Sequence, residues 1–412
     1  MSNDLVITDI RELVTWQPLV SERRFANIKE DDLGRVKNAW CYVEHGQVAD
    51  FGSGPCPYSP KNQISAEGGL VLPGLVDSHT HLLFGGSRAE EFTRRLAGAT
   101  YQEIAAMGGG IQETVRGSRA LSDEEHEKLV TARLQEFLRQ GVTTLEAKSG
   151  YGLSVDEELR HLRILNRCKA NTEQTLSVTC LALHAASPDY DDLAAYIKDC
   201  RTKLLPKVKR EGLADWVDAF IENGYFQVED VNDYMKTAKE LGFGIRIHAD
   251  EFSDAGAALA AVHWGAASAD HMQFAADEAL GAMATAGTVA TLLPGTSLYT
   301  NIRYTNGERF VEAGVPVAVA SDYNPGSSYI NNLAMLATLS SLYCGISPYT
   351  ALAGVTLVAA KSLNLEKSKG ALAQGMDADL CIYKNLSSVE EWIYDFGKTQ
   401  PSQVLIGGEN AL

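Results

Sequence analysis

Short apolar runs alternate with amphipathic stretches through the middle of the chain, from about residue 142 to residue 322. The runs are rich in Val, Ile, Leu, Thr and Ala, and their near-continuous apolarity is typical of strands buried in a parallel sheet. They predict eight strands: Gly74–His81, Thr143–Lys148, Leu176–Leu183, Trp216–Glu222, Gly244–His248, Ala267–His271, Thr288–Leu293 and Pro316–Ser321.

The stretches between these strands begin and end like helices. Ser122-Asp-Glu-Glu125 is a capping box ahead of an apolar pattern. Glycines such as Gly265 and Gly287 stand just before the next strand, where a left-handed residue commonly ends a helix. This alternation predicts an α/β fold in the form of a closed (β/α)₈ barrel, with a doubly wound open sheet as the alternative.

Both ends of the chain have a different pattern, with short strand-like pieces between glycines and prolines. These pieces are Leu5–Thr8, Ala39–Val43, Ala378–Tyr383 and Val404–Gly407. We predict that residues 1–72 and 371–412 meet in one small β-sandwich domain, and that residues 73–370 form the catalytic barrel.

Length and charge narrow the classes of function. A chain of 412 residues suits a barrel with a smaller appended domain. Its formal net charge of −17 is spread along the chain and repels phosphate backbones, so we expect no nucleic-acid partner.

The seven cysteines are scattered and include no C-x-x-C, which favours reduced thiols in the cytoplasm. No apolar run is long enough for a membrane span, so no membrane association is expected.

Histidines and one aspartate stand where predicted strands end. His79 and His81 are two residues apart, so their side chains point the same way from the first strand. His248 ends the fifth strand, His271 ends the sixth, and Asp322 follows the eighth. An H-x-H pair alone is a weak signal. Because the carboxyl ends of barrel strands carry the active site, the repeated placement predicts that these side chains converge.

Imidazole nitrogens with a carboxylate suit Zn²⁺ or Fe²⁺ and are poor ligands for Mg²⁺ or Ca²⁺. A water that completes the ligand shell becomes acidic enough to act as a nucleophile near neutral pH. The pattern therefore indicates metal-dependent hydrolysis.

The segment Leu72-Pro-Gly-Leu-Val-Asp-Ser-His-Thr-His81 resembles the signature of the amidohydrolase superfamily, and the later histidines and aspartate follow in its order. More specific segments resemble the imidazolonepropionase family: Phe84–Glu90, Met107–Ile111, Glu146–Gly152 and Ser321–Ser327. The resemblance implies a small-molecule substrate, 4-imidazolone-5-propanoate, whose cyclic amide is hydrolysed to N-formimidoyl-L-glutamate in histidine degradation.

The resemblance also implies the metal site. Many superfamily members bridge two metals with a carbamylated lysine on the fourth strand, but that strand here offers Glu222 and no lysine. We therefore expect one Zn²⁺ or Fe²⁺/Fe³⁺ per chain, with Lys148 of the second strand as an open alternative for a bridge. The expected ligands are His79, His81, His248 and Asp322.

Three residues are expected to take part in catalysis. Asp322 can accept the proton of the water, and His271 can hydrogen-bond to the water or to the substrate carbonyl. Glu251 follows His248 by three residues, and as a general acid it would protonate the leaving nitrogen. The alternative for Glu251 is a carboxylate that caps the following helix.

Substrate contacts are implied at the same end of the barrel, from Arg88, Tyr151, His184, Glu251, Asn324, Gly326 and Ser327. A propanoate needs a fixed cation, and arginine binds carboxylates in a two-pronged fashion, so Arg88 is the candidate, with an ordinary surface arginine as the alternative. Tyr101 and the Gly108–Gly110 loop are candidates for a cover.

Two other functions stay open. One is an aminohydrolase that deaminates a ring amidine, as cytosine or guanine deaminases do, since these share the ligands and an H-x-x-E loop like His248–Glu251. The other is a non-catalytic barrel that serves in binding or assembly. Arg88 favours the imidazolone reading, and we expect a homodimer, which is common among such barrels.

Overall fold

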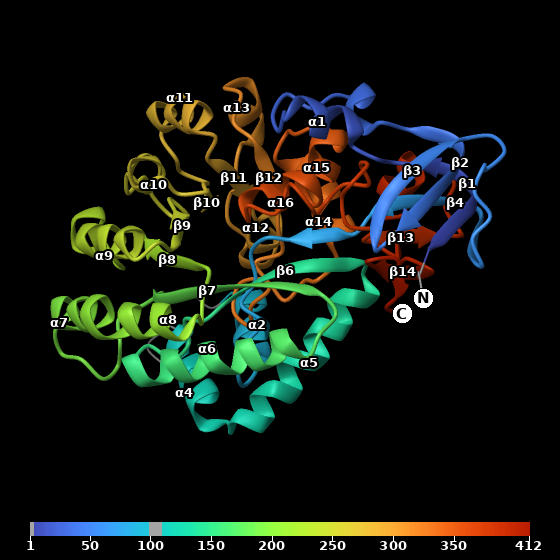
Figure 1. Cartoon of the computed structure of the whole chain (residues 1–412). Helices are drawn as coiled ribbons and strands as arrows, with labels where there is room; N and C mark the ends of the chain where they lie inside the picture. Colours follow the sequence, from blue (N-terminus) through green and yellow to red (C-terminus); the bar gives the residue numbers. More distant parts are fainter. Residues whose placement is uncertain (1–3, 99–108) are drawn as a thin grey trace.

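The computed structural model describes residues 4–98 and 109–412. The eight predicted barrel strands are hydrogen-bonded in chain order into one parallel sheet (Figure 1). Their bounds are β5 Leu75–Asp77, β6 Val142–Lys148, β7 Thr175–Leu183, β8 Trp216–Ile221, β9 Gly244–Ala249, β10 Ser268–His271, β11 Val289–Leu292 and β12 Val317–Val319. The (β/α)₈ prediction is confirmed, with strand ends shifted by a few residues.

The sheet closes into a barrel just beyond the ends of β5 and β12. The amide of Asp322 donates to the carbonyl of His79 at 3.0 Å, and the amide of His81 donates to the carbonyl of Tyr323 at 2.9 Å. A parallel bridge between Thr80 and Tyr323 lies between these bonds. We call this contact the closing seam, and it joins the two segments that carry three of the expected ligands.

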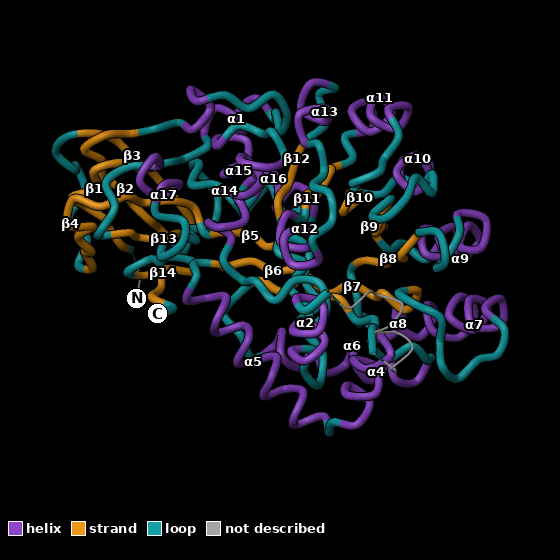
Figure 2. Tube along the Cα trace, turned by 180° about the vertical axis from the view of Figure 1, so that it is seen from behind, coloured by secondary structure: helices purple, strands orange, loops and turns teal. Residues whose placement is uncertain are grey.

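Helices pack around the outside of the barrel (Figure 2). Their bounds are α2 Ala89–Leu96, α4 Ile111–Ala120, α5 Asp123–Arg139, α6 Val155–Ala170, α7 Leu193–Asp199, η2 Cys200–Leu204, α8 Leu205–Glu211, α9 Val228–Glu240, α10 Ala257–Trp264, α11 Asp277–Ala286, α12 Pro294–Thr300, α13 Gly307–Glu312, α14 Leu333–Tyr343, α15 Pro348–Gly354 and α16 Leu357–Ser362. None of the helices in the described part is long and apolar enough to cross a membrane.

The structure confirms predicted signals at both the starts and the ends of helices. Ser122 Oγ accepts from the amide of Glu125, whose carboxylate accepts from the amide of Ser122, so the capping box is confirmed. Gly265 and Gly287 take left-handed conformations directly after α10 and α11.

Both ends of the chain build a second sheet, beside which the two termini lie (Figure 1). Its strands, in spatial order, are β15 Glu409–Asn410, β14 Gln403–Ile406, β13 Leu380–Tyr383, β4 Asn62–Pro73, β1 Leu5–Leu13, β2 Val36–Glu44 and β3 Gln47–Ser53. The prediction of a small β domain built from both ends is confirmed, and its described strands are hydrogen-bonded into one continuous sheet. The reason is β4, which pairs with β1 along most of its length and with β13 through its last residues, and so joins the two ends.

The terminal sheet is fastened to the barrel by apolar side chains. Trp16 and Leu33, near α1 (Gln17–Glu22) and η1 (Glu30–Leu33), are fully buried in the same core as the barrel strands. Trp392 of α17 (Val389–Tyr394) joins that core from the other end of the chain. This packing leaves the carboxyl ends of the barrel strands as the place where polar side chains gather.

Candidate metal centre and substrate pocket

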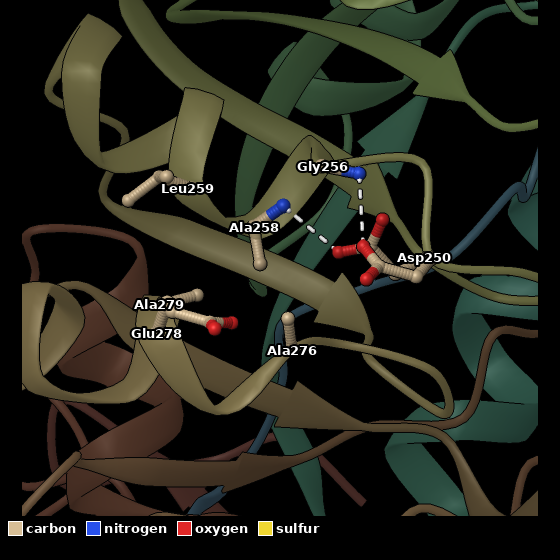
Figure 3. A pocket seen from close by; sticks show the side chains of 8 residues that line it. Asp250, Gly256, Ala258, Leu259, Ala276, Glu278 and Ala279 are labelled. Carbon is tan, nitrogen blue, oxygen red and sulfur yellow. Dashed lines mark hydrogen bonds between the residues drawn. The ribbon is translucent and has the colours of Figure 1, made fainter.

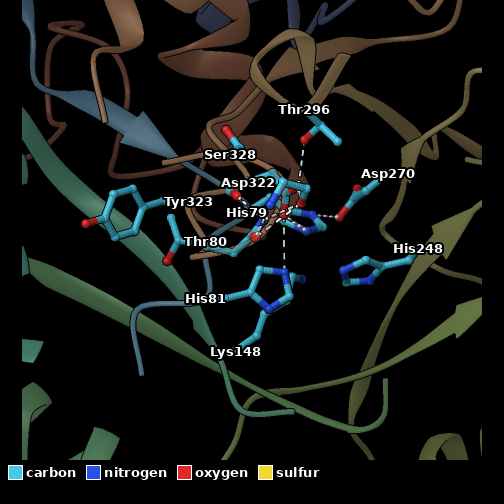
Figure 4. A network of polar contacts seen from close by, with 12 residues as sticks. His79, Thr80, His81, Lys148, His248, Asp270, Thr296, Asp322, Tyr323 and Ser328 are labelled. Atoms are coloured by element: carbon cyan, nitrogen blue, oxygen red, sulfur yellow. Dashed lines mark hydrogen bonds and ion pairs between the residues drawn. The ribbon is translucent and has the colours of Figure 1, made fainter. Parts of the chain in front are cut away.

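Four histidines and one aspartate gather at the carboxyl ends of the barrel strands: His79, His81, His248, His271 and Asp322 (Figure 4 labels all but His271). Ligand atoms of His79, His81 and His248 lie within 4.8 Å of one another, and so do those of His79, His271 and Asp322. The structure therefore brings the four expected ligands together and places His271 against the same centre.

Asp322 faces two of these rings. Its Oδ1 lies 3.5 Å from His79 Nε2 and 3.3 Å from His81 Nε2. Ligand atoms placed about 2.1 Å from a tetrahedral ion are about 3.4 Å apart, so the spacing suits one metal ion. His79 Nε2 and His248 Nε2 are buried and have no hydrogen-bond partner among the described residues. Because such orphaned polar atoms are rare in folded proteins, the donor set fits an ion such as Zn²⁺ or Fe²⁺.

Buried carboxylates set the orientation of two of the rings. Asp270 Oδ2 lies 2.7 Å from His79 Nδ1, and Asp218 Oδ2 lies 3.0 Å from His248 Nδ1. A charged carboxylate can only accept, so each Nδ1 carries the hydrogen and each Nε2 keeps its lone pair for the centre. Burial alone would raise the pKa of Asp218, but the charges of His248 and Lys148 hold it well below its usual value.

Lys148 lies below this centre, inside the barrel. Its Nζ donates to Glu146 Oε1 at 2.7 Å and to Asp218 Oδ2 at 2.8 Å, and all three side chains are fully buried. Burial alone would lower the pKa of Lys148, but the charges of Asp218 and Glu146 raise it. Carbamylation requires the neutral amine, so this arrangement argues against Lys148 as a bridge between two metals.

Glu251 is another buried acid beside this centre. Its Oε2 lies 3.6 Å from His271 Nδ1, and burial, together with the charges of Asp322 and Glu222, raises its pKa well above the usual value. Glu222, at the end of β8, accepts from the amides of Phe252 and Ser253 at 2.7 and 3.2 Å. Glu222 thus holds the loop that presents Glu251, and within the described part of the chain no helix amide donates to the Glu251 carboxyl.

Tyr151 and His184 form one wall of the pocket. The His184 ring stacks on His81 with centroids 5.1 Å apart, and the Tyr151 ring lies 5.3 Å from that of His184. His184 Nδ1 is 3.1 Å from the carbonyl of Gly150, which fixes the ring as a hydrogen donor there. Both predicted contacts therefore lie beside the metal centre.

The last loop of the barrel begins directly after Asp322 and lies beside the end of the first strand. Asn324 Oδ1 accepts from the amides of Gly326 and Ser327, both at 2.8 Å, and its Nδ2 donates to the carbonyl of Asp322 at 2.6 Å. These bonds occupy the Asn324 side chain, so it shapes the turn. Arg88 lies against Gly326 of this turn. Tyr101 and Gly108, expected in a cover, lie outside the described residues.

Comparisons with known proteins agree with this geometry. The family model described as the amidohydrolase family matches residues 70–411. The imidazolonepropionase of Symbiobacterium thermophilum is 46% identical over 80% of this chain and 77% of its own length. That of Geobacillus kaustophilus is 37% identical over 98% of this chain and 97% of its own. The chain belongs to the amidohydrolase family, among the imidazolonepropionases.

Solved structures of other amidohydrolases share the fold. A triazine hydrolase variant superposes with a TM-score of 0.78 at 14% identity, covering 99% of this chain and 94% of that one. An adenosine deaminase from Xanthomonas campestris, solved with bound zinc, gives 0.73 at 16% identity, covering 99% and 93%. These likenesses show the fold, while the family match and the named relatives identify a hydrolase, and its described residues include a histidine-rich site.

Polar residues that the sequence analysis did not single out complete the centre of this amidohydrolase. Thr296, at the start of α12, donates from Oγ1 to Asp322 Oδ2 at 2.6 Å (Figure 4). Asp218 stands within the apolar run of β8, and Asp270 directly precedes His271. A charged residue inside an otherwise apolar strand was the available signal for Asp218. Nothing in the local pattern marks Thr296.

A second hollow lies away from this centre, between α10 and α11 (Figure 3). The buried acid beside it, Asp250, accepts from the amides of Ala255, Ala257 and Ala258 at 2.9 to 3.1 Å. The carboxylate thus satisfies the first turn of α10, which is a capping role.

Proposed function

We propose that this amidohydrolase hydrolyses 4-imidazolone-5-propanoate to N-formimidoyl-L-glutamate. The observation that carries the proposal is the position of Arg88. Its guanidinium lies against Gly326, which follows Asp322 by four residues. Burial raises the pKa of Tyr151, whose ring lies beside His81, and the charge of Arg88 acts to lower it. A ring amide with a propanoate arm needs both a centre for its carbonyl and a cation for its carboxylate. The named relatives support the same substrate.

We propose one Zn²⁺ or Fe²⁺/Fe³⁺ per chain, held by His79, His81, His248 and Asp322. When bound, such an ion acidifies a water and polarises the substrate carbonyl. The spacing of these four side chains suits one ion, as described above. Asp218 and Asp270 orient His248 and His79 through the Nδ1 atoms of the two rings.

The chain's own residues divide the proton transfers. Asp322 takes the proton of the attacking water on a carboxylate oxygen. His271, whose pKa burial holds well below the usual value, is neutral and donates or accepts a hydrogen bond at the carbonyl. Glu251 starts protonated and gives its proton to the ring nitrogen as the amide bond breaks.

The remaining pocket residues orient the substrate. We propose that Arg88 binds the propanoate, and that Tyr151 and His184 bind the ring from the wall beside His81. Gly326 and Ser327 line the opposite side, in the turn that Asn324 holds. These residues would hold both the ring and the carboxylate of the substrate, which is the positioning that catalysis requires.

The test is a substrate screen with the purified, metal-loaded protein. We expect turnover of 4-imidazolone-5-propanoate, with cytosine and guanine turned over far more slowly or not at all. Loss of activity in chelator and its return with added metal separates an enzyme from a binding protein. Release of ammonia from cytosine or guanine at the higher rate would contradict the proposal and establish a deaminase instead.

Metal content is the first specific prediction. We expect one metal atom per chain, measured by elemental analysis and located by anomalous scattering at the zinc and iron edges. The reason is that Lys148 is engaged as a charged donor between Glu146 and Asp218. Two strong anomalous peaks bridged by Lys148 would be incompatible with this prediction.

Asp218→Asn is expected to weaken metal affinity by about 10- to 100-fold without unfolding the protein. The amide keeps the shape of the carboxylate but cannot hold the hydrogen on His248 Nδ1 as firmly. Competition with a chelator measures the affinity, and Asp233→Asn on α9, a largely exposed acid, is the control. Equal affinities of the two variants would show that Asp218 does not act through His248.

We further propose the organisation expected from the sequence: residues 1–72 with 371–412 as a structural unit, and 73–370 as the catalytic unit. The seven free cysteines, six of them buried, support a reducing, cytoplasmic setting. A homodimer is the proposed assembly, and light scattering in solution measures it.

A further inference from the structure

Arg88 is already engaged by a carboxylate of its own helix. Its Nε donates to Glu91 Oε2 at 2.9 Å, and its Nη2 donates to Glu91 Oε1. The side chains of Arg88 and Glu91 are only 14% and 10% exposed. Glu91 therefore binds the Nε and Nη2 side of the guanidinium, and no hydrogen bond joins Nη1 to another of the described residues.

The Nη1 end of Arg88 lies against the last loop of the barrel. A Cβ built on Gly326 would lie 1.9 Å from Arg88 Nη1 and 2.6 Å from Arg88 Cζ. Only a glycine therefore lets the guanidinium lie at this point. Gly326 makes the contact possible through close approach, since its φ is not in the left-handed region.

Glu91 has a second connection that holds it in place. Its Oε2 also accepts from the amide of Gly110 at 2.9 Å, and Gly110 is the residue that precedes α4. Burial alone would raise the pKa of Glu91, but hydrogen bonds from Arg88 and the Gly110 amide lower it below its usual value. The carboxylate is therefore charged and anchored on two sides.

A second arginine compensates the charge of Glu91. Arg95 Nη2 donates to the carbonyl of Gly326 at 2.8 Å, so it reaches the same turn as Arg88. Its guanidinium lies 5.5 and 5.6 Å from the ring centroids of Phe92 and Tyr299. These aromatic rings hold it in place without neutralising it.

We propose that Glu91 is the positioning residue of carboxylate recognition, and that Arg88, Glu91 and Arg95 form one anion site with a net charge of +1. This inference rests on the proposed function, since it assigns the substrate carboxylate to that site. Glu91 aligns the Nη1 end of Arg88 with the pocket, and Arg95 restores the positive charge that Glu91 cancels. A single carboxylate then neutralises the site.

The direction in which loss of the Glu91 charge changes anion binding distinguishes a positioning role from a purely electrostatic one. If only charge mattered, removing the negative Glu91 would raise the local charge and tighten binding of an anion. If Glu91 positions Arg88, removing its charge frees the guanidinium and weakens binding, although the site becomes more positive. Charge-assisted hydrogen bonds are about twice as strong as neutral ones, so glutamine cannot substitute.

The experiment uses Glu91→Gln in the metal-loaded enzyme, with Glu90→Gln as the matched control. Glu90 is the preceding residue, and its side chain is 91% exposed. We expect Glu91→Gln to raise KM for imidazolone propanoate by about 10-fold with kcat changed much less. On the 5-propyl imidazolone, which lacks the carboxylate, both variants should match the wild type. An unchanged or lower KM for Glu91→Gln on the propanoate substrate would overturn the proposal.

A second pair of measurements keeps the test independent of turnover. Calorimetric binding of imidazole-4-propanoate, compared with 4-propylimidazole, should show the same carboxylate-specific loss in Glu91→Gln. Gly326→Ala displaces Arg88 from the other side and should give the same signature, which covers the case that Glu91→Gln folds poorly. If the wild type bound both compounds alike, the anion site would be wrong. If it bound the propanoate selectively but did not hydrolyse imidazolone propanoate, the proposed function would fail and the site would stand.

Discussion

Replacement of Glu251 by glutamine is expected to lower kcat by about 10²- to 10⁴-fold while the metal content stays unchanged. Glutamine fills the same space beside His271 but has no proton to give to the leaving nitrogen. Steady-state kinetics and elemental analysis of the same sample measure both quantities. Asp254→Asn, an exposed acid in the same loop, is the control and should keep wild-type activity.

The pH profile gives this prediction a direction. The raised pKa of Glu251 means that its protonated, acid form persists to a higher pH than for an ordinary glutamate. As pH rises through that pKa, the acid is lost, so the kcat of the wild type should fall on the alkaline side. In the Glu251→Gln variant, kcat should show no such fall at alkaline pH. Near-normal kcat for the variant from pH 6 to 9 would remove Glu251 from the chemistry and leave it as a pocket residue.

Replacement of Arg88 by alanine is expected to lower kcat/KM on imidazolone propanoate by roughly 10²-fold or more. Hydrogen bonds to charged groups contribute about 1.5 to 3 kcal/mol each, and the variant loses the group that faces the carboxylate. Arg88→Lys should recover only part of the rate, because an ammonium cannot bond to Glu91 and to the substrate with the same planar geometry.

A substrate without the carboxylate provides the comparison for Arg88. The wild type should lose much of its advantage on the 5-propyl imidazolone, and Arg88→Ala should turn it over at nearly the wild-type rate. Arg94→Ala, on the same helix with a side chain that is 52% exposed, is the control for effects on α2. Equal losses on both substrates would make Arg88 a structural residue.

The placement of the site was predictable because each of its main residues directly follows an apolar run. His248 and His271 end β9 and β10, and Asp322 follows β12, so the barrel geometry alone brings them together. The partners behind them were not predictable in the same way. Asp218 meets Lys148 of β6 and His248 of β9 only once the barrel has formed, and no pattern within one strand records such a neighbour.

The pairing of the strands in the terminal domain was unpredictable for a similar reason. Local patterns identified strand-like pieces at both ends of the chain, but the pairing partners of a strand are set by long-range contacts. The long strand β4 was not among the predicted pieces, and it is the strand that joins the two ends into one sheet. The partner of Arg88 was missed because Glu91 reads as an ordinary acid in the first turn of a helix.

The closing seam has a consequence for the order in which the centre can be made during synthesis. His79 and His81 leave the ribosome early, but their backbone partners Asp322 and Tyr323 are about 240 residues further along the chain. Until those residues emerge, the first barrel strand has only β6 as a neighbour in its sheet, and the histidines lack their carboxylate. A nascent chain that stops short of residue 322 therefore cannot assemble the full set of proposed ligands, so the proposed four-ligand centre forms only late in translation or after release.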